Sequence, residues 1–570
     1  MKLSSRTVAG LCGIFLAGAA VLMAAPAGAA TYGHPAGKAS RGTLAAGGIG
    51  RAVAVRSVNV RMAAAGPQIA SHGRPSGPLG RDGKVAGSNL PVRASTGAKP
   101  RLAAPPAVAG GPNTGRAAKT AASLARPGIS NSPPTKINVN FKGMTQGRSN
   151  CGACQPPDPN AAVSASQIAH AVNLRLQVYT KIGGLLCGVA LNTLAGTTAV
   201  LSDPHIQYDN VSKRFSMVII PVPASDTAAP TEYVLASKTS SACGSWWVYT
   251  VTFSGSLLPP GTLMDYPYLG QDNTPSASYP SGGSILSSTN DFCCSSNSFG
   301  SYLGSTAFAI PKYPVYHGQA FSFPVFSVSF STAPVSVSGL GKTVTTNTYW
   351  LASVPGSGYN LYVMTHSSQP GTTLTLQASV TSAFSPPSRR VNQPGTTHTL
   401  DPLDGRIVWA PVRAGPFIWF THGVDLGGFP AVRWGAISIA SNTATVALAY
   451  HNTASDDFNP SLTVTSAGGT NIYGWLNWAY TDTPADVATS DTVNGVRPGQ
   501  GVPNEAGTDK TLIRGSSTST NFRFGDFSSL EVDPAAASST CPAGRTAVLA
   551  QQYFNSSGQW VTRLARASFC

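Results

Sequence analysis

The chain has 570 residues with 38 Lys and Arg against 22 Asp and Glu, so its formal net charge is +16. Residues 31–136 hold fifteen Lys and Arg against the single acid Asp82, whereas residues 137–570 carry 21 charges of each sign. A nucleic-acid-binding domain needs its positive charge on the folded part, so this distribution argues against a nucleic-acid partner. After the first thirty residues no uncharged apolar run reaches the roughly 18 residues of a membrane-spanning helix, so no membrane insertion is expected.

Residues 1–29 have the pattern of a secretory signal peptide. Lys2 and Arg6 precede an apolar run over residues 7–23, and the small residues 27–29 provide a signal-peptidase site. The sequence therefore predicts an extracellular or cell-surface protein.

The mature chain would keep eight of the nine cysteines. In an oxidising compartment an even number predicts disulfides, although eight cysteines allow about 105 pairings. The Cys151-x-x-Cys154 spacing is followed by two prolines and lacks a second pair at matching spacing, so we interpret it as structural rather than as a zinc or redox motif. We expect Cys541 to pair with Cys570, because both flank strand-like segments near the C-terminus.

Residues 30–136 are rich in Ala, Gly, Pro and Arg and have almost no aromatic residues. Such a segment cannot bury enough apolar surface to offset the entropy of ordering it, so the sequence predicts a disordered basic tail. The tail is a solvated spacer, or it contacts anionic wall polymers through screened electrostatics.

Residues 137–570 predict an all-β domain, because short runs rich in Val, Ile, Thr and aromatic residues alternate with Gly, Pro, Asn and Ser clusters. No break suggests tandem sandwiches, and about 60 residues per four-stranded unit predicts a six- or seven-bladed β-propeller. Residues 137–141 and 559–569 are candidate strands to close the ring. Residues 161–179 have the only helical spacing, and Tyr208 to Phe215 reads as a hairpin.

Short signatures spread along this domain carry a family resemblance. The chain resembles secreted bacterial proteins, mostly of unknown function, with a sialidase-like propeller fold. The segments are 155–173, 202–215, 265–270, 307–312, 403–412, 523–534 (RFGDFSSLEVDP) and 558–565. The resemblance implies the fold and little about chemistry.

A sialidase-like fold raises the hypothesis of glycoside hydrolysis, which needs a carboxylic acid to protonate the leaving oxygen and a nucleophile or base opposite it. Sialidases use a tyrosine nucleophile with a neighbouring glutamate, and arginines suit the substrate carboxylate. Four residues of the recurring signatures are the catalytic candidates: Glu531, Asp526, Asp203 and Arg523. The Asp-box of sialidases, Ser-x-Asp-x-Gly-x-Thr-Trp, does not occur in the chain.

No cofactor is expected, and calcium is the one ion left open. Asp401 with Asp404, and Asp456 with Asp457, have spacings that a loop could wrap around a cation, against the alternative of self-capping turns. The histidines occur singly, without the spacing of a metal site. Exposed tryptophans at loop ends could stack on sugars, but most of them should be core residues.

These features favour a noncatalytic module that binds extracellular polysaccharide, other glycans or protein through one propeller face. The alternative is a sialidase-like glycoside hydrolase, and a purely structural role in a wall or coat is a third reading. Two carboxylates about 5 to 10 Å apart with arginines beside them would favour the hydrolase.

Overall fold

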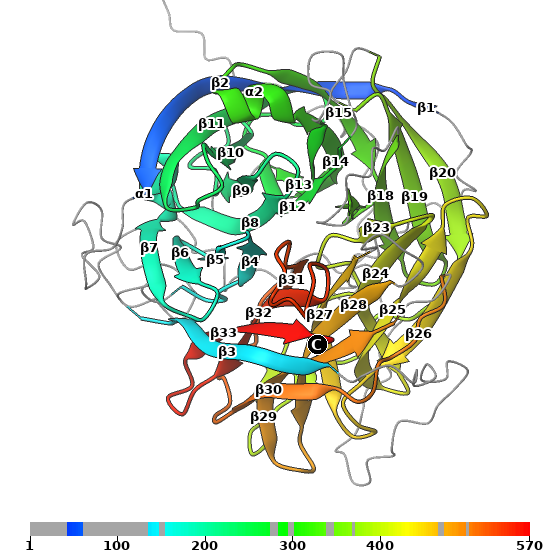
Figure 1. Cartoon of the computed structure of the whole chain (residues 1–570). Coiled ribbons are helices and arrows are strands. Elements are labelled where there is room, and N and C mark those ends of the chain that lie inside the picture. The colour runs from blue at the N-terminus through cyan, green and yellow to red at the C-terminus, as the bar shows by residue number, and fades with distance from the viewer. Residues whose placement is uncertain are drawn as a thin grey trace, which may run out of the picture. The chain divides into compact units, whose positions relative to one another are not determined.

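The computed structural model describes residues 43–60, 135–147, 154–273, 283–293, 301–337, 347–367, 371–465, 472–497 and 501–570. All of them belong to one compact unit, Lys38–Cys570. The helices of this described part are short: α1 (Leu191–Ala195) and α2 (Lys312–His317). The remaining elements are strands (Figure 1). The predicted signal peptide lies outside the described residues.

The described strands form seven blades of four antiparallel strands each, named from the inner strand outward, and blade 5 carries an additional parallel strand at its inner edge. Blade 1 contains β4 (Asn160–Val163), β5 (Gln167–Val172), β6 (Arg175–Thr180) and β7 (Leu185–Ala190). Blade 2 contains β8 (Leu201–Asp209), β9 (Arg214–Pro221), β10 (Thr231–Ser237) and β11 (Gly244–Gly255). Blade 3 contains β12 (Leu263–Gln271), β13 (Ser284–Cys293), β14 (Ser301–Pro311) and β15 (Ser322–Val328).

The other blades follow in chain order. Blade 4 contains β16 (Ala333–Pro334), β18 (Asn347–Val354), β19 (Gly358–Thr365) and β20 (Thr373–Thr381). Blade 5 contains β23 (Val412–Ala414), β24 (Phe417–Leu426), β25 (Phe429–Ser438) and β26 (Ala444–Ala449), with β17 (Ser336–Val337) parallel to β23. Blade 6 contains β27 (Asp456–Thr465), β28 (Tyr473–Asp482), β29 (Val487–Val496) and β30 (Lys510–Gly515). Blade 7 contains β31 (Ser529–Val532), β32 (Thr546–Phe554), β33 (Trp560–Ser568) and β3 (Lys136–Thr145).

The inner strands lie side by side around one axis. β4 contacts β8, β8 contacts β12, and β12 contacts both β16 and β17. The series continues from β17 through β23 and β27 to β31, which contacts β4 again (Figure 1). This arrangement confirms the predicted β-propeller and gives it seven blades.

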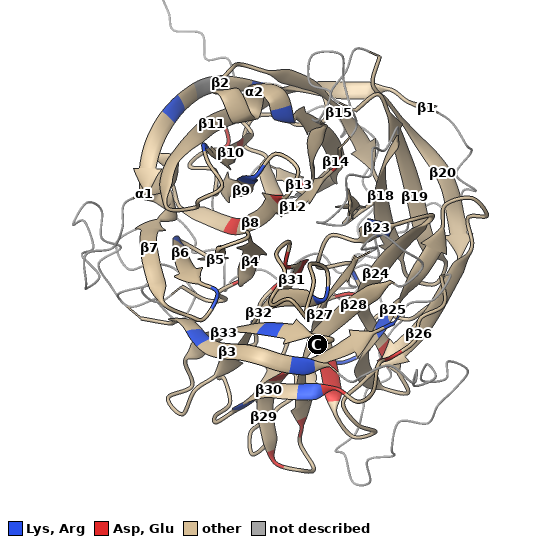
Figure 2. Cartoon of the chain, viewed as in Figure 1, with Lys and Arg blue, Asp and Glu red and all other residues tan. Residues whose placement is uncertain are grey.

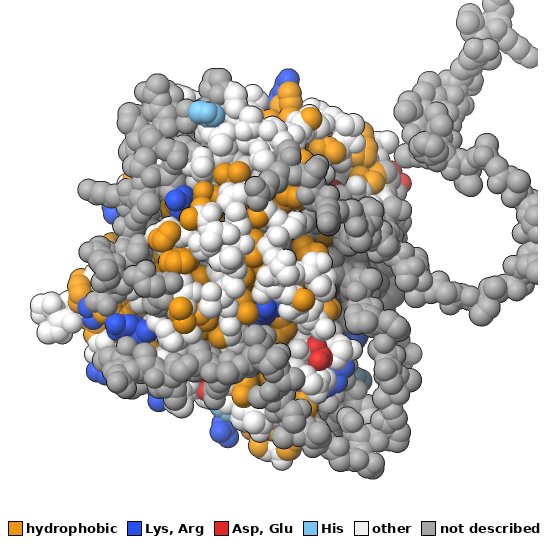
Figure 3. All heavy atoms as spheres, turned by 90° about the vertical axis from the view of Figure 1, so that its right-hand side faces the viewer, with side chains coloured by type: hydrophobic (Ala, Val, Ile, Leu, Met, Phe, Trp, Pro, Cys, Tyr) orange, Lys and Arg blue, Asp and Glu red, His pale blue; other side chains and the backbone are white. Residues whose placement is uncertain are grey.

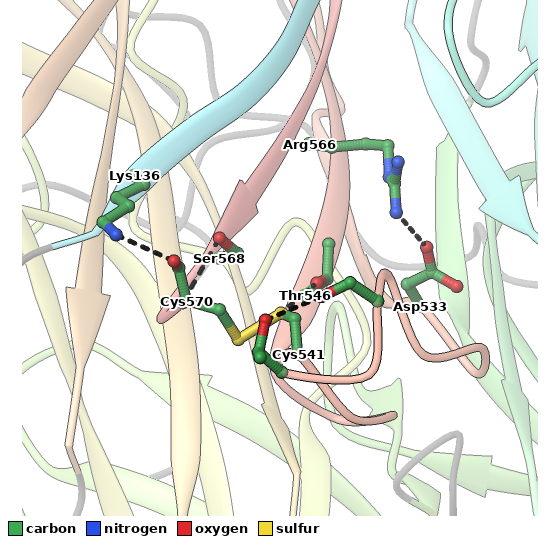
Figure 4. The surroundings of a disulfide bond; sticks show 9 residues. Lys136, Asp533, Cys541, Thr546, Arg566, Ser568 and Cys570 are labelled. Carbon is green, nitrogen blue, oxygen red and sulfur yellow. Dashed lines mark hydrogen bonds and ion pairs between the residues drawn. A yellow bond between two sulfur atoms is a disulfide. The ribbon is translucent and has the colours of Figure 1, made fainter.

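Blade 7 closes the ring with both ends of the domain, as predicted. β3 pairs antiparallel with β33, with Phe141 opposite Leu564. The predicted disulfide Cys541–Cys570 joins the loop before β32 to the C-terminal residue (Figure 4). Lys136 donates from Nζ to the main-chain oxygen of Cys570 at 2.8 Å and so ties β3 to the same corner. A second disulfide, Cys187–Cys243, joins the outer parts of blades 1 and 2.

The core consists of layers of apolar side chains between neighbouring blades. One cluster joins blades 1 and 2 around Trp246, and another joins blades 5 and 6 around Trp434 and Trp478. Both faces of most strands are therefore buried, and the blades carry few charges (Figure 2). From the side of β20, hydrophobic side chains are scattered among uncharged polar ones (Figure 3).

The helix predicted over residues 161–179 is wrong, because this segment forms β4, β5 and most of β6. Leu174 adopts a left-handed φ of 74° and turns the chain between β5 and β6. Strands buried on both faces have apolar runs whose spacing cannot be distinguished from that of a buried helix. The predicted hairpin is confirmed, with Asp209 opposite Arg214.

The structure also differs from the expected tail over residues 30–136. Within that range, β1 (Thr43–Leu44) pairs with β20, and β2 (Ala46–Val60) pairs with both β11 and β15. The segment has too few apolar residues to fold alone, but existing sheet edges provide its hydrogen bonds.

Candidate functional site

The axis of the propeller is lined by strands whose inner edges have no strand partner. Every N–H group on such an edge needs an acceptor, because an unpaired buried N–H is costly. Polar side chains from adjacent blades supply these acceptors. Ser529 Oγ accepts the Ala161 N–H at 2.8 Å, and Asn160 Oδ1 accepts the Ile206 N–H at 3.0 Å.

Glu531 performs this role for two blades at once. Its Oε2 accepts the Val163 N–H of β4 at 2.7 Å, and its Oε1 accepts the Tyr208 N–H of β8 at 3.1 Å. Burial raises the pKa of Glu531 to about 8, although the two N–H groups act in the opposite direction. The carboxyl group that most resembles a general acid therefore connects three inner strands.

Asp526 and Asp203 lie at the other end of the axis, where the inner strands begin. The backbone N–H of Asp526 donates to Asp158 Oδ1 at 2.7 Å, and Asn173 Nδ2 donates to Asp158 Oδ2 at 2.7 Å. The backbone N–H of Asp203 donates to Asn173 Oδ1, and its carboxylate accepts the Ser202 hydroxyl. Asp158 and Asn173 are thus central to this end of the axis, although they were not among the predicted site residues.

Three residues that precede proline form β-bulges in the inner strands. Asp203, Tyr266 and Asn459 each have a left-handed φ, precede proline and sit where the strand register shifts. Proline lacks an N–H group, so it fits the position where the bulge interrupts pairing. The bulges recur in blades 2, 3 and 6.

Arg523 is the positive centre of this end of the axis. It is buried and donates from Nη2 to Asp526 Oδ2 at 2.6 Å. Burial lowers the pKa of this guanidinium, but surrounding carboxylates raise it by more. These carboxylates, in decreasing order of effect, are Asp526, Asp158, Asp401 and Asp265.

The four catalytic candidates do not form one acid pair. Arg523, Asp526 and Asp203 lie where the inner strands begin, whereas Glu531 follows Asp526 by five residues and contacts the end of β4. Glu531 accepts N–H groups near the ends of β4 and β8, whereas Asp526 donates its backbone N–H to Asp158, which precedes β4. The two carboxyl groups therefore have separate structural partners at different ends of the inner strands.

His205 is a buried polar residue on the axis that sequence reasoning treated as an isolated histidine. Its ring meets Phe527 edge-on, with a centroid distance of 4.3 Å, and lies 6.1 Å from Trp409 in a stacked arrangement. Burial lowers the pKa of His205 to about 3, so it is neutral at physiological pH. A neutral imidazole among aromatic rings belongs to the packing of the axis.

The calcium candidates are engaged with other side chains. Asp456 accepts two hydrogen bonds from Arg389, at 2.6 and 2.8 Å, while Asp457 accepts from Trp478 Nε1 at 3.0 Å. Asp404 pairs with Arg406.

Asp401 Oδ1 accepts the Leu403 N–H at 3.0 Å, as expected of a self-capping turn. Within the described residues, no three His, Cys, Asp or Glu side chains are grouped so as to hold a metal ion.

A hairpin between blades 4 and 5 packs on the loop that carries Arg523 and Asp526. We call residues 388–404 the cap hairpin; it contains β21 (Val391–Asn392) and β22 (Thr399–Leu400). Gln393 exchanges two hydrogen bonds of 2.8 Å with the Ser519 backbone, and the Asp401 N–H donates to the Phe522 carbonyl at 2.8 Å. Its tip exposes Gly395, Thr397 and His398.

The tryptophans are almost all core residues, as expected. Trp247 is the only one of the nine that is not buried, and Lys238 Nζ lies 3.4 Å from the centroid of its ring. Neither face of the propeller therefore presents an exposed tryptophan on which a sugar could stack.

Comparison with known proteins gives no family assignment. No known family model and no curated protein matches the chain. Among solved structures, a Penicillium chrysogenum α-L-arabinanase complexed with arabinobiose matches with a TM-score of 0.36 and 10% identity, over 76% of this chain and 99% of that one. A neuraminidase-like protein of a little yellow-shouldered bat isolate from Guatemala matches with a TM-score of 0.32 and 7% identity, over 60% and 96%.

A chain from an S. cerevisiae complex of Dbp5 with Nup159 and Gle1 matches with a TM-score of 0.34 and 9% identity, over 77% of this chain and 96% of that one. The propeller assignment rests on this chain's own strand order and register. No helix among the described residues is long and apolar enough to cross a membrane.

Proposed function

We propose that this protein is an extracellular recognition module that binds a glycan, without hydrolysing it, through the face where the inner strands begin. The proposal rests on the hydrogen bonds that the side chains at the axis make with the backbone. Glu531 and Ser529 accept backbone N–H groups of neighbouring inner strands, and Asp158 accepts the N–H of Asp526 in the loop before β31, so these groups maintain the ring. The disulfides support a location outside the cytoplasm, because such bonds persist in oxidising compartments.

The cap hairpin is the proposed contact element on this face. It is anchored to blade 6 by Arg389–Asp456 and to the loop before blade 7 by Gln393. A rigid base that presents a short exposed tip is a common design for a binding loop. The hydroxyl and imidazole groups of Thr397 and His398 offer hydrogen bonds that suit sugar hydroxyls.

Binding of the full-length protein to a glycan array and to insoluble polysaccharides tests the proposal. The Thr397→Ala/His398→Ala variant should lose at least 10-fold in affinity for any bound glycan. Ser441→Ala, an exposed change in the turn between β25 and β26, is the matched control and should bind as the wild type does. Absence of any glycan binding, or binding unchanged in the tip variant, would refute the proposed site.

A glycoside hydrolase is the second candidate, favoured by the carboxylates around Arg523. In this reading Asp158 and Asp265 would replace Glu531 as the reacting acids. Turnover of chromogenic glycosides that is abolished by Asp265→Asn would establish this candidate.

A further inference from the structure

The strand β2 lies between the outer edges of blades 2 and 3, where the two blades do not pair with each other directly. The seven blades close through β3 and β33, so the ring is complete without β2. The outermost strands of blades 2 and 3, β11 and β15, pair with opposite edges of β2 (Figure 1). Without β2 both would present unpaired N–H and C=O groups, which readily accept another strand.

The fit of β2 to this gap depends on its small residues. A Cβ atom added at Gly48 would lie 2.6 Å from the Ser254 carbonyl oxygen, and one added at Gly50 would lie 2.3 Å from the Phe323 ring. The Ser254 oxygen belongs to the backbone and cannot move aside, so the site selects glycine at Gly48, whereas a side chain at Gly50 would require the buried Phe323 ring to shift.

In the second half of β2, side chains that pack against the blades alternate with exposed ones. Val58 packs against the cluster around Trp246, and Val60 is buried in it, whereas Ser57 and Asn59 are exposed. Arg56 donates from Nη2 to the Leu194 carbonyl of α1 at 2.9 Å. The gap therefore recognises a sequence, with glycine in the first half and alternate valines in the second.

We propose that the edges of β11 and β15 form an acceptor for an extended peptide strand, which residues 43–60 of a second copy of this chain occupy in exchange for the chain's own strand. Val60 and Thr135, which begins the next described segment, are separated by 74 residues. A chain of that length can reach up to roughly 250 Å, so covalent connection does not decide which copy supplies the strand. Exchange of an identical element between copies is a general route to assembly.

Two full-length variants separate the strand from the acceptor. Gly48→Val/Val58→Asp should prevent docking of the chain's own strand, because valine meets backbone atoms and aspartate meets the apolar cluster. Ile49→Ala/Val55→Thr is the matched control, since both side chains are about 40% exposed (41% and 42%) and point away from the core.

The binding experiment uses a fluorescent peptide of residues 43–60 and anisotropy. The Gly48→Val/Val58→Asp chain should bind it saturably at 1:1, and at least 10-fold more weakly when the peptide carries Gly48→Val. The wild-type and control chains, whose acceptors are filled, should bind little peptide within minutes. A natively folded Gly48→Val/Val58→Asp chain that does not bind the peptide would overturn the proposal.

Strand exchange is tested first on the wild-type protein, whose result does not depend on how the variant folds. Isotopically heavy and light full-length chains are mixed at high concentration and analysed by native mass spectrometry. Mixed dimers are expected for the wild type and the control. Their absence at every concentration, or their persistence in a natively folded Gly48→Val/Val58→Asp chain, would contradict exchange through β2.

Discussion

Replacement of Glu531 by Gln tests whether this carboxyl group connects the inner strands. Both oxygens accept a backbone N–H, from Val163 at 2.7 Å and from Tyr208 at 3.1 Å. At pH 5 the protonated carboxyl group still offers an oxygen to each N–H, because a hydroxyl oxygen also accepts hydrogen bonds. Glutamine retains one acceptor and directs its NH₂ group, which cannot accept, at the other N–H, which is then unsatisfied. Loss of one such acceptor in a buried position costs about 1–3 kcal/mol, so Glu531→Gln should be less stable than the wild type by that amount at pH 5.

The same substitution should change the pH dependence of stability. Burial raises the pKa of Glu531 from 4.5 to about 8, so the folded state holds its proton more tightly than the unfolded state. This contribution to stability is fully present below pH 4.5 and is lost as pH rises towards 8, with an upper limit of about 5 kcal/mol. Glutamine does not titrate, so the deficit of the variant should shrink between pH 5 and pH 9.

Urea unfolding followed by tryptophan fluorescence at pH 5 and pH 9 measures both effects. Asp486→Asn, an exposed acid in a turn with a left-handed φ of 55°, is the control and should change little. Wild-type stability of Glu531→Gln at pH 5 would refute the connecting role of this residue.

Three further predictions concern the core, the C-terminus and the cap hairpin. Burial raises the pKa of the fully buried Glu232 to about 8, so Glu232→Gln should stabilise the protein at pH 9 relative to pH 5 when urea midpoints are compared with those of the wild type. Cys541→Ser/Cys570→Ser opens a loop with a sequence separation of 29 and should lower the unfolding free energy by about 3–4 kcal/mol, measured by the same method. Arg389→Ala removes two hydrogen bonds to the buried Asp456, so limited proteolysis should cut within the cap hairpin faster than in the wild type.

Local chemistry allowed several features to be predicted from the sequence. Alternating strands and turn residues predicted the propeller, the hairpin from Tyr208 to Phe215 and the closing strands. The Cys541–Cys570 pair followed from the proximity of both residues to strands at the C-terminus. Each of these depends on neighbouring residues or on the ends of the domain.

The features that sequence reasoning missed depend on contacts between distant blades. Whether Glu531 faces a substrate or the N–H groups of β4 and β8 depends on how the inner strands of different blades are placed around the axis. No local sequence pattern encodes that placement. The 46–60 strand was missed because its partners, β11 and β15, follow it by almost 200 residues or more. Asp158 could have been found, since it precedes proline at the start of an inner strand as Asp203 does within one.

The most direct test is the activity of the full-length protein on a panel of chromogenic glycosides between pH 4 and pH 8. If the axial carboxyl groups serve the backbone of the inner strands, no substrate should be turned over above the uncatalysed rate. Hydrolysis that disappears in Glu531→Gln or Asp158→Asn, while both variants remain folded, would show instead that these groups react with a sugar.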